Sequence, residues 1–269
     1  MVKPEPSFYR LHKFTDQYLM EYLFPPGPAT PSVFLFMRGP MLNNSKGDPI
    51  ASYKAITDQD PLDSCVIAPR QIHGTRMISN NHDNCLPLRP EADAISLDTS
   101  PGFWASLRFA DCYPVIFYLA GTNPFLCILH SGFKGTVNKI AGLALLSLVK
   151  RFGNKNLSQC HVRIGPGIGP CCYWRRSDDR LTLQAIGMLP EGRWKKSGER
   201  VFFDLPGIIR DTCLEYNVPE ENIATIDLCT SCNPEACYSY RNGDIEKRMF
   251  LIARFLPSCQ KEMKWWENI

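Results

Sequence analysis

A cysteine and a histidine near the middle of the chain could form a reactive pair. Cys112 precedes one short apolar β-type run and His130 follows the next, with a Gly/Pro turn at 121–124 between them. Residue 121 is midway between the two side chains, so an antiparallel hairpin places them opposite each other, within about a residue. Both lie where a strand meets polar, glycine-rich sequence, and rigid scaffolds often carry functional sites at such strand ends.

His73 is a third candidate, because the segment QIHG (71–74) follows the apolar run 65–68. Together His73, Cys112 and His130 offer two nitrogen ligands and one sulfur ligand. Three such ligands, with the fourth position left to water, are typical of catalytic zinc. The plain alternative is that each is a buried polar residue without a metal, but the hairpin register argues against coincidence for Cys112 and His130.

Strands and helices must position these side chains. One helix should begin near Thr136 and stop at Gly153, and another should begin at the N-cap Asp204 and end at Asn217. This mixture indicates an α/β or α+β layered domain. The apolar runs that predict strands are 32–37, 65–68, 103–108, 115–119, 125–129, 161–164 and 223–228.

The composition excludes several function classes. The chain has 269 residues, 44% hydrophobic and 21% charged, and its net charge of +3 provides no basic field for nucleic acid. The longest apolar stretch, 113–129, is interrupted by prolines and cannot span a membrane. Residues 1–17 lack the apolar core of a secretion signal. We therefore expect a cytoplasmic protein with one domain over 1–269 that binds neither nucleic acid nor membrane.

Twelve cysteines are expected to be reduced in such a compartment, with no disulfides. Those inside apolar runs should be buried core residues. They are Cys65, Cys127, Cys160, Cys213 and Cys259.

Six ordered segments resemble the YfiH-like family, which includes multicopper polyphenol oxidase or laccase domains and purine nucleoside phosphorylases. The resemblance covers about residues 30–255. It implies an α+β fold built as a single-domain four-layer α-β-β-α sandwich, and it implies that His73, Cys112 and His130 are metal ligands. The segments are QIHG, EADAI, ADCYP, HSGFKGT, IGPGIGPCCY and CT…YSYR.

The chain departs from the family pattern around the expected substrate pocket. Phe133 and Lys134 stand where the family commonly has Trp and Arg, Asn242 replaces a second arginine, and Trp174 replaces an acidic residue. The N-terminal asparagine motif is reduced to Asn43. The metal ligands are unchanged, so metal binding is the firmer expectation.

The resemblance implies zinc-dependent phosphorolysis of purine nucleosides such as adenosine, inosine and methylthioadenosine, with adenosine deamination as a side activity. Asp111, beside Cys112, is either a proton shuttle for catalysis or a carboxylate that orients a ligand. The loop 132–136 opens a helix and suits phosphate, where Lys134 and Arg241 could add charge.

Small-molecule nucleoside and phosphate are therefore the expected partners, and the sequence does not indicate an oligomeric state. Arg241 is assigned both a catalytic and a substrate-binding role, together with Asn43, Lys134 and Tyr173 as substrate-binding residues. The Gly/Pro-rich segment 165–173 should form a pocket wall, and its adjacent Cys171 and Cys172 are interpreted as structural.

Other functions stay open at this point. Cys112 could be the nucleophile of a Cys/His hydrolase or deamidase. An amidase that edits peptidoglycan precursors is a further alternative. A structural zinc knuckle built on Cys229, Cys232 and Cys237 lacks a fourth ligand. A four-copper oxidase is excluded, because it needs about ten histidines and the chain has five with no His-x-His pair. Copper could still bind the His73, Cys112 and His130 set, since such ligands prefer it to zinc.

Overall fold

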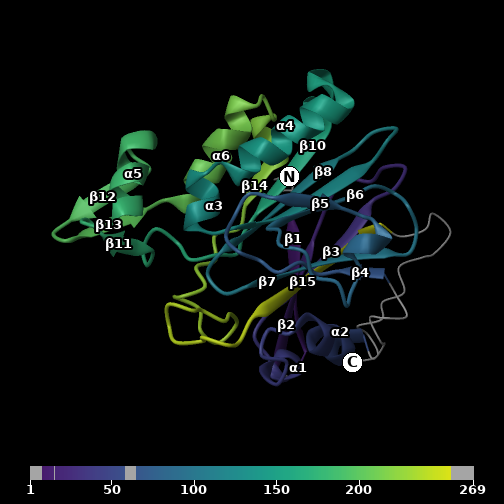
Figure 1. Cartoon of the computed structure of the whole chain (residues 1–269), viewed down its shortest axis with the longest axis horizontal. Helices are drawn as coiled ribbons and strands as arrows, with labels where there is room; N and C mark the ends of the chain where they lie inside the picture. Colours follow the sequence, from purple (N-terminus) through teal and green to yellow (C-terminus); the bar gives the residue numbers. More distant parts are fainter. Residues whose placement is uncertain (1–7, 15, 58–64, 256–269) are drawn as a thin grey trace, which may run out of the picture.

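The computed structural model describes residues 8–14, 16–57 and 65–255. Most of its strands form two stacked six-stranded sheets (Figure 1). The first sheet, in spatial order, contains β1 (Tyr9–Phe14), β2 (Gln17–Tyr22), β3 (Pro31–Phe36), β15 (Met249–Phe255), β7 (Phe103–Phe109) and β4 (Cys65–Ile67). The second contains β14 (Ile223–Thr225), β10 (Cys160–Ile164), β8 (Tyr113–Leu119), β9 (Phe125–Ser131), β6 (Ala94–Leu97) and β5 (Met77–Ser79).

Helices cover the two outer faces of the sheet pair (Figure 1). Side chains of α1 (Pro40–Asn43) and α2 (Pro49–Thr57) pack into the core of the first sheet, and α4 (Ile140–Phe152) and α6 (Leu205–Glu215) pack on the second. The predicted four-layer α-β-β-α arrangement is therefore confirmed. That residues 1–269 form one domain stays a prediction.

The central strands β8 and β9 are buried along their whole length. Alternate side chains point to opposite faces, so Ile116 and Ile128 join the core between the sheets, whereas Val115 and Leu129 join the core under α4 and α6. Burial on both faces explains why these strands have continuous apolar sequences.

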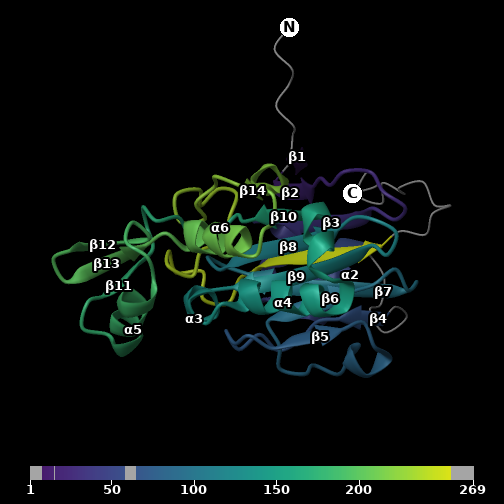
Figure 2. The same cartoon turned by 90° about the horizontal axis from the view of Figure 1, so that it is seen from above.

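A small lobe projects from one end of the sandwich, as Figure 2 shows. It contains the three-stranded sheet β11 (Trp174–Arg176), β13 (Arg200–Phe203) and β12 (Trp194–Ser197) together with α5 (Arg180–Met188). The remaining elements are α3 (Phe133–Val137) and the short 3-10 helices His82–Asn84, Asn154–Gln159 and Glu220–Asn222.

Most predicted elements exist, with two changed bounds. The predicted helix near Thr136 is divided into α3 and α4, because Lys139 adopts a left-handed conformation with φ 59°. The predicted strand 223–228 ends at Thr225. The helix that begins after Asp204 is confirmed, and the Asp204 carboxylate accepts a hydrogen bond from the Gly207 amide at 3.0 Å.

The hairpin register differs from the prediction by two residues. His130 pairs with Pro114, and Tyr113 pairs with Ser131, so the turn is centred on residue 122 and not 121. Cys112 therefore lies beyond the last pair, next to Gly132. Because side chains alternate with a period of two, this shift leaves Cys112 on the side of the hairpin that His130 occupies.

The prediction of no disulfides is wrong, because Cys65 and Cys85 are joined. The segment around Cys85 runs antiparallel to β4, with a bridge between Ile67 and Cys85, and this brings the two Cα atoms to 5.2 Å. Cys127, Cys160 and Cys213 are buried as expected, and Cys259 lies outside the described residues.

In the part of the chain that the structure describes, the helices are all too short or too polar to cross a bilayer.

Candidate metal centre

His73, Cys112 and His130 meet at one end of the sheet pair. Their potential ligand atoms all lie within 4.8 Å of one another. His73 comes from the loop after β4, Cys112 from the turn between β7 and β8, and His130 from the end of β9. The structure thus brings together the three residues chosen from the sequence.

Gly132 allows these side chains to approach one another closely. A Cβ atom on Gly132 would lie 2.6 Å from Cys112 Sγ and 3.1 Å from His73 Cδ2. Only glycine therefore fits beside the three ligands. Two imidazoles and a thiol match the donor set that zinc prefers, and they also suit copper. That a metal binds here stays a prediction.

Asp93 organises both histidines, and the sequence reasoning missed it. Its buried carboxylate lies 2.8 Å from His130 Nδ1. It also accepts hydrogen bonds from three consecutive amides, those of Ile72, His73 and Gly74, at 3.2, 2.9 and 2.7 Å. These amides form an anion-binding nest that holds His73 at φ 58°. The sequence signal that could have identified this residue is its place in the EADAI segment, where Asp93 directly precedes an apolar strand.

The protonation states around Asp93 suit a metal. Burial raises the pKa of Asp93, but the hydrogen bonds from His130 and the amides outweigh it and hold the pKa below its usual value. Burial lowers the pKa of His130, although Asp93 opposes this effect. Neutral His130 can donate Nδ1–H to Asp93 and keep Nε2 free for a ligand bond, as metal-binding histidines commonly do.

Without a cation, Cys112 is held as a thiol. Burial, followed by the charges of Asp111 and Asp93, raises the pKa of Cys112 to about 12. A nucleophilic cysteine needs the opposite shift. A bound metal would ionise the thiol directly, because a coordinating thiol loses its proton.

Asp111 has a positioning role in this geometry. One oxygen of its carboxylate accepts a hydrogen bond from the Thr230 hydroxyl at 2.7 Å, and the other accepts one from the Arg241 amide at 2.8 Å. Asp111 itself has a φ of 83°, which is strained for a residue with a side chain. These contacts fix the turn that carries Cys112. Whether Asp111 also shuttles a proton stays a prediction.

The three candidate ligands line a cavity of about 1010 Å³. Cations dominate its walls, whereas Asp111 and Glu246 are its only acidic lining residues among those described. Such an excess of positive charge favours an anionic ligand. The basic lining residues are Lys46, Arg70, Arg89, Arg108, Lys134, Arg175, Arg241 and Arg248.

Arg108 is one of the six basic lining residues that the sequence reasoning did not name, and its side chain is the most deeply buried of these. It lies at the end of β7, its side chain is buried, and its Nη1 has no hydrogen-bond partner. Its Nη2 donates to the Pro69 carbonyl. Burial, with the nearby charge of Arg89, lowers the pKa of Arg108 to about 9. The available signal was an arginine inside the apolar run that leads to Cys112.

Three of the four predicted substrate-binding residues line this cavity. Lys134 is exposed at the start of α3, and the Tyr173 ring lies 5.8 Å from the Phe133 ring, between centroids. The Arg241 guanidinium donates to the carbonyls of Cys172 and Trp174 at 3.1 and 3.0 Å. These hydrogen bonds tie Arg241 to the loop that forms one wall of the pocket.

Asn43 lies outside the residues that line the cavity. It ends α1, and its side-chain oxygen accepts a hydrogen bond from Tyr238 at 2.9 Å. The neighbouring residues Lys46 and Gly47 reach the cavity instead. In the structure Asn43 therefore contacts Tyr238 and does not line the cavity.

Comparison of the sequence with models of known protein families identifies the family of this chain. A family model described as multi-copper polyphenol oxidoreductase laccase matches residues 51–253. The chain belongs to this family. The match includes all three candidate ligands and Asp93, and it confirms the resemblance to YfiH-like proteins. The described multicopper activity does not follow for this chain, whose five histidines are too few for a four-copper enzyme.

Curated relatives carry the name purine nucleoside phosphorylase. YlmD of Geobacillus stearothermophilus is 33% identical over 174 residues, which are 61% of each chain. YlmD of Bacillus subtilis is 30% identical over 51% of this chain and 49% of its own. YfiH of Escherichia coli is 27% identical over 66% and 69%. The matched part thus spans about half to two thirds of these relatives.

Solved structures of the family share the fold. The crystal structure of YlmD from Geobacillus stearothermophilus has a TM-score of 0.74 at 21% identity and covers 94% of this chain and 100% of its own. The structure of a YfiH protein from Bacillus licheniformis has a TM-score of 0.71 at 22% identity, with 84% and 93% covered. The α+β fold of this laccase-family chain is therefore shown.

Proposed function

We propose that this chain is a zinc-dependent purine nucleoside phosphorylase that releases the base and ribose 1-phosphate, with slower adenosine deamination. One observation carries the proposal. The candidate metal ligands and Arg108, a buried cation whose Nη1 has no hydrogen-bond partner, line the same cavity. A metal would thus lie beside a site that needs an anion.

The residues His73, Cys112 and His130 would hold the zinc. When bound, zinc supplies a Lewis acid and lowers the pKa of a water, which deamination of a purine needs. Asp93 holds the His130 proton at Nδ1 and so directs Nε2 toward the metal. Copper fits the same ligand set, so metal analysis must accompany every activity measurement.

Phosphorolysis needs phosphate next to the ribose. The Arg108 guanidinium, which lines the cavity, would bind a phosphate oxygen through a charge-assisted hydrogen bond. The cationic cavity would draw the anion in. Phe133 and Tyr173 offer apolar ring surface to the purine base. Nucleoside and phosphate are therefore the proposed substrates.

The competing functions with a cysteine nucleophile, a Cys/His hydrolase or deamidase, receive no support from the site. They need Cys112 as an accessible thiolate. Burial and nearby carboxylates instead keep this thiol protonated, with its pKa raised to about 12. Stoichiometric metal and resistance of Cys112 to alkylation would separate metal chemistry from a cysteine nucleophile.

The deciding experiment is an assay of adenosine, inosine and methylthioadenosine with and without phosphate, on protein of known metal content. We expect base release to depend on phosphate and ribose 1-phosphate to form. Equal release without phosphate would contradict phosphorolysis. Release by metal-free Cys112→Ala would contradict the role of the metal.

A further inference from the structure

Four cysteines gather outside the His73 site. Cys171 and Cys172 lie in the loop after β10, and Cys229 and Cys232 lie in the loop after β14. The four sulfur atoms all lie within 4.8 Å of one another. The sequence joined Cys229 and Cys232 to Cys237, but Cys237 is buried and is not part of this group. The pair at 171–172 provides the ligands that the sequence pattern lacked.

The distances between these sulfur atoms approach those of a tetrathiolate site. Cys232 Sγ lies 3.3 Å from Cys172 Sγ and 3.8 Å from Cys171 Sγ. Zn–S bonds of about 2.3 Å in a tetrahedron place the sulfur atoms roughly 3.8 Å apart. The cluster therefore has the right number of ligands and nearly the right size before any ion is added.

The backbone around the cluster is shaped for close approach of sulfur atoms. The Gly169 amide donates to Cys229 Sγ at 3.1 Å, a contact that stabilises a thiolate. A Cβ atom on Gly169 would lie 3.2 Å from Cys171 Sγ and 3.3 Å from Cys229 Cβ. These features favour a metal-binding cluster.

We propose that Cys171, Cys172, Cys229 and Cys232 bind a structural zinc ion, separate from the ion held by His73, Cys112 and His130. Four thiolates leave no open position for water, which is typical of structural and not catalytic zinc. Zinc needs no redox partner, so binding only releases the thiol protons.

The proposed ion would join two loops that build the wall of the large cavity. The Cys172 carbonyl accepts a hydrogen bond from Arg241, in the loop that follows Cys232. In that same loop Thr230 and Arg241 hold Asp111, the neighbour of Cys112. By joining these loops, the zinc ion would stabilise the position of Asp111 and, through it, the turn that carries Cys112.

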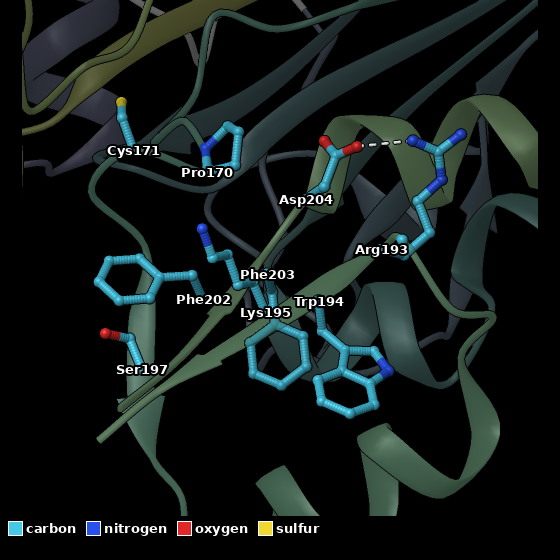
Figure 3. Close-up of a pocket in the computed structure, with 10 residues that line it drawn as sticks. Pro170, Cys171, Arg193, Trp194, Lys195, Ser197, Phe202, Phe203 and Asp204 are labelled. Carbon is cyan, nitrogen blue, oxygen red and sulfur yellow. Dashed lines mark hydrogen bonds and ion pairs between the residues drawn. The ribbon is translucent and has the colours of Figure 1, made fainter. Parts of the chain in front are cut away.

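Cys171 borders a second, smaller pocket of about 400 Å³ (Figure 3). In this view its sulfur points away from Trp194 and Phe202, which lie across the pocket beside β12 and β13. An ion pair between Arg193 and Asp204 closes the opposite side. The Cys171 sulfur lies within 4.8 Å of the sulfur atoms of the other three cysteines.

The test is the zinc content of the purified full chain. We expect two zinc ions in each chain, and one in Cys232→Ser or Cys171→Ser. Both cysteines are exposed, so the substitutions should leave the fold intact. The matched control is Cys237→Ala, a neighbouring cysteine outside the cluster, which should keep two. The same zinc content in Cys232→Ser as in the wild type would overturn the proposal, whatever the first site binds.

A second measurement uses the Cys112→Ala chain, in which the first site is disabled. Cobalt added to this chain should give the charge-transfer and ligand-field bands of a tetrahedral all-sulfur site, and Cys232→Ser in this background should abolish them. Hydrogen exchange in 165–173 and 229–242 should rise when the ion is lost. A disulfide between Cys172 and Cys232 in non-reduced peptide maps of the purified chain would contradict the proposal.

Discussion

The Nδ1 atom of His130 lies 2.8 Å from the carboxylate of Asp93, a residue with no exposed surface. The same carboxylate also accepts a hydrogen bond from the backbone amide of His73 at 2.9 Å. One buried acid thus orients both candidate histidine ligands, His73 from the loop after β4 and His130 from the end of β9. This relation explains why a metal site could be stable at the open end of a hairpin.

Asp93→Asn should weaken zinc binding about 10- to 100-fold. The neutral side chain of asparagine accepts weaker hydrogen bonds from His130 and from the three backbone amides than the carboxylate does. Competition with a chelator measures this affinity. Asp98→Asn is the matched control, since Asp98 ends the same β6 region and bonds Asn80 instead. An equal loss of affinity in both variants would argue against a specific role of Asp93.

Cys112→Ala should lose the first zinc ion and both enzymatic activities together. The reason is that a three-ligand site cannot keep its metal with two histidines alone. Metal analysis and the nucleoside assay provide the readout. Cys127→Ala removes another buried cysteine from β9, outside the metal clusters, and should keep metal and activity. Activity without metal in Cys112→Ala would contradict this assignment.

Arg108→Gln should raise the KM for phosphate by at least about tenfold while leaving adenosine deamination nearly unchanged. A hydrogen bond to a charged group is worth about 1.5–3 kcal/mol, which corresponds to that factor or more. Arg70→Gln is the control in the same cavity, because Arg70 is exposed and already paired with Glu91. A parallel loss of deamination would indicate that Arg108 supports the fold and not phosphate.

The metal-free protein should lose stability as the pH falls. The pKa of His130 is lowered in the folded state, so the folded chain binds fewer protons than the unfolded one and stability drops below about pH 6.5. The pKa of Asp93 is also lowered, and its contribution is lost as the pH falls below about 4 through the folded value. Urea unfolding of chelated protein at several pH values measures both steps.

His130→Gln should lose the His130 share of the first step, keep the share that comes from His161, and keep the general acid unfolding. His161→Gln is the control, because burial also lowers the pKa of His161 but this residue lies outside the candidate site. An unchanged slope between pH 6.5 and pH 5 in His130→Gln would show that His130 does not carry the effect.

The sequence by itself determined most local elements and the choice of the three candidate ligands, His73, Cys112 and His130. Apolar runs predict the central strands because both faces of β8 and β9 are buried, and Asp204 marks the start of α6 by its capping chemistry. The predicted hairpin register was wrong by two residues, yet Cys112 and His130 still meet. A strand repeats its facing every two residues, so this particular error did not move either side chain to the other face.

Only the tertiary structure decided which distant groups meet. Asp93 contacts residues about 20 and 37 positions away, and the two cysteine pairs of the second cluster are about 60 apart. Such contacts depend on how whole sheets and loops pack, and neither periodicity nor spacing encodes that packing. The disulfide between Cys65 and Cys85 and the unpartnered Nη1 of Arg108 were hidden for the same reason, because burial and partners exist only after folding.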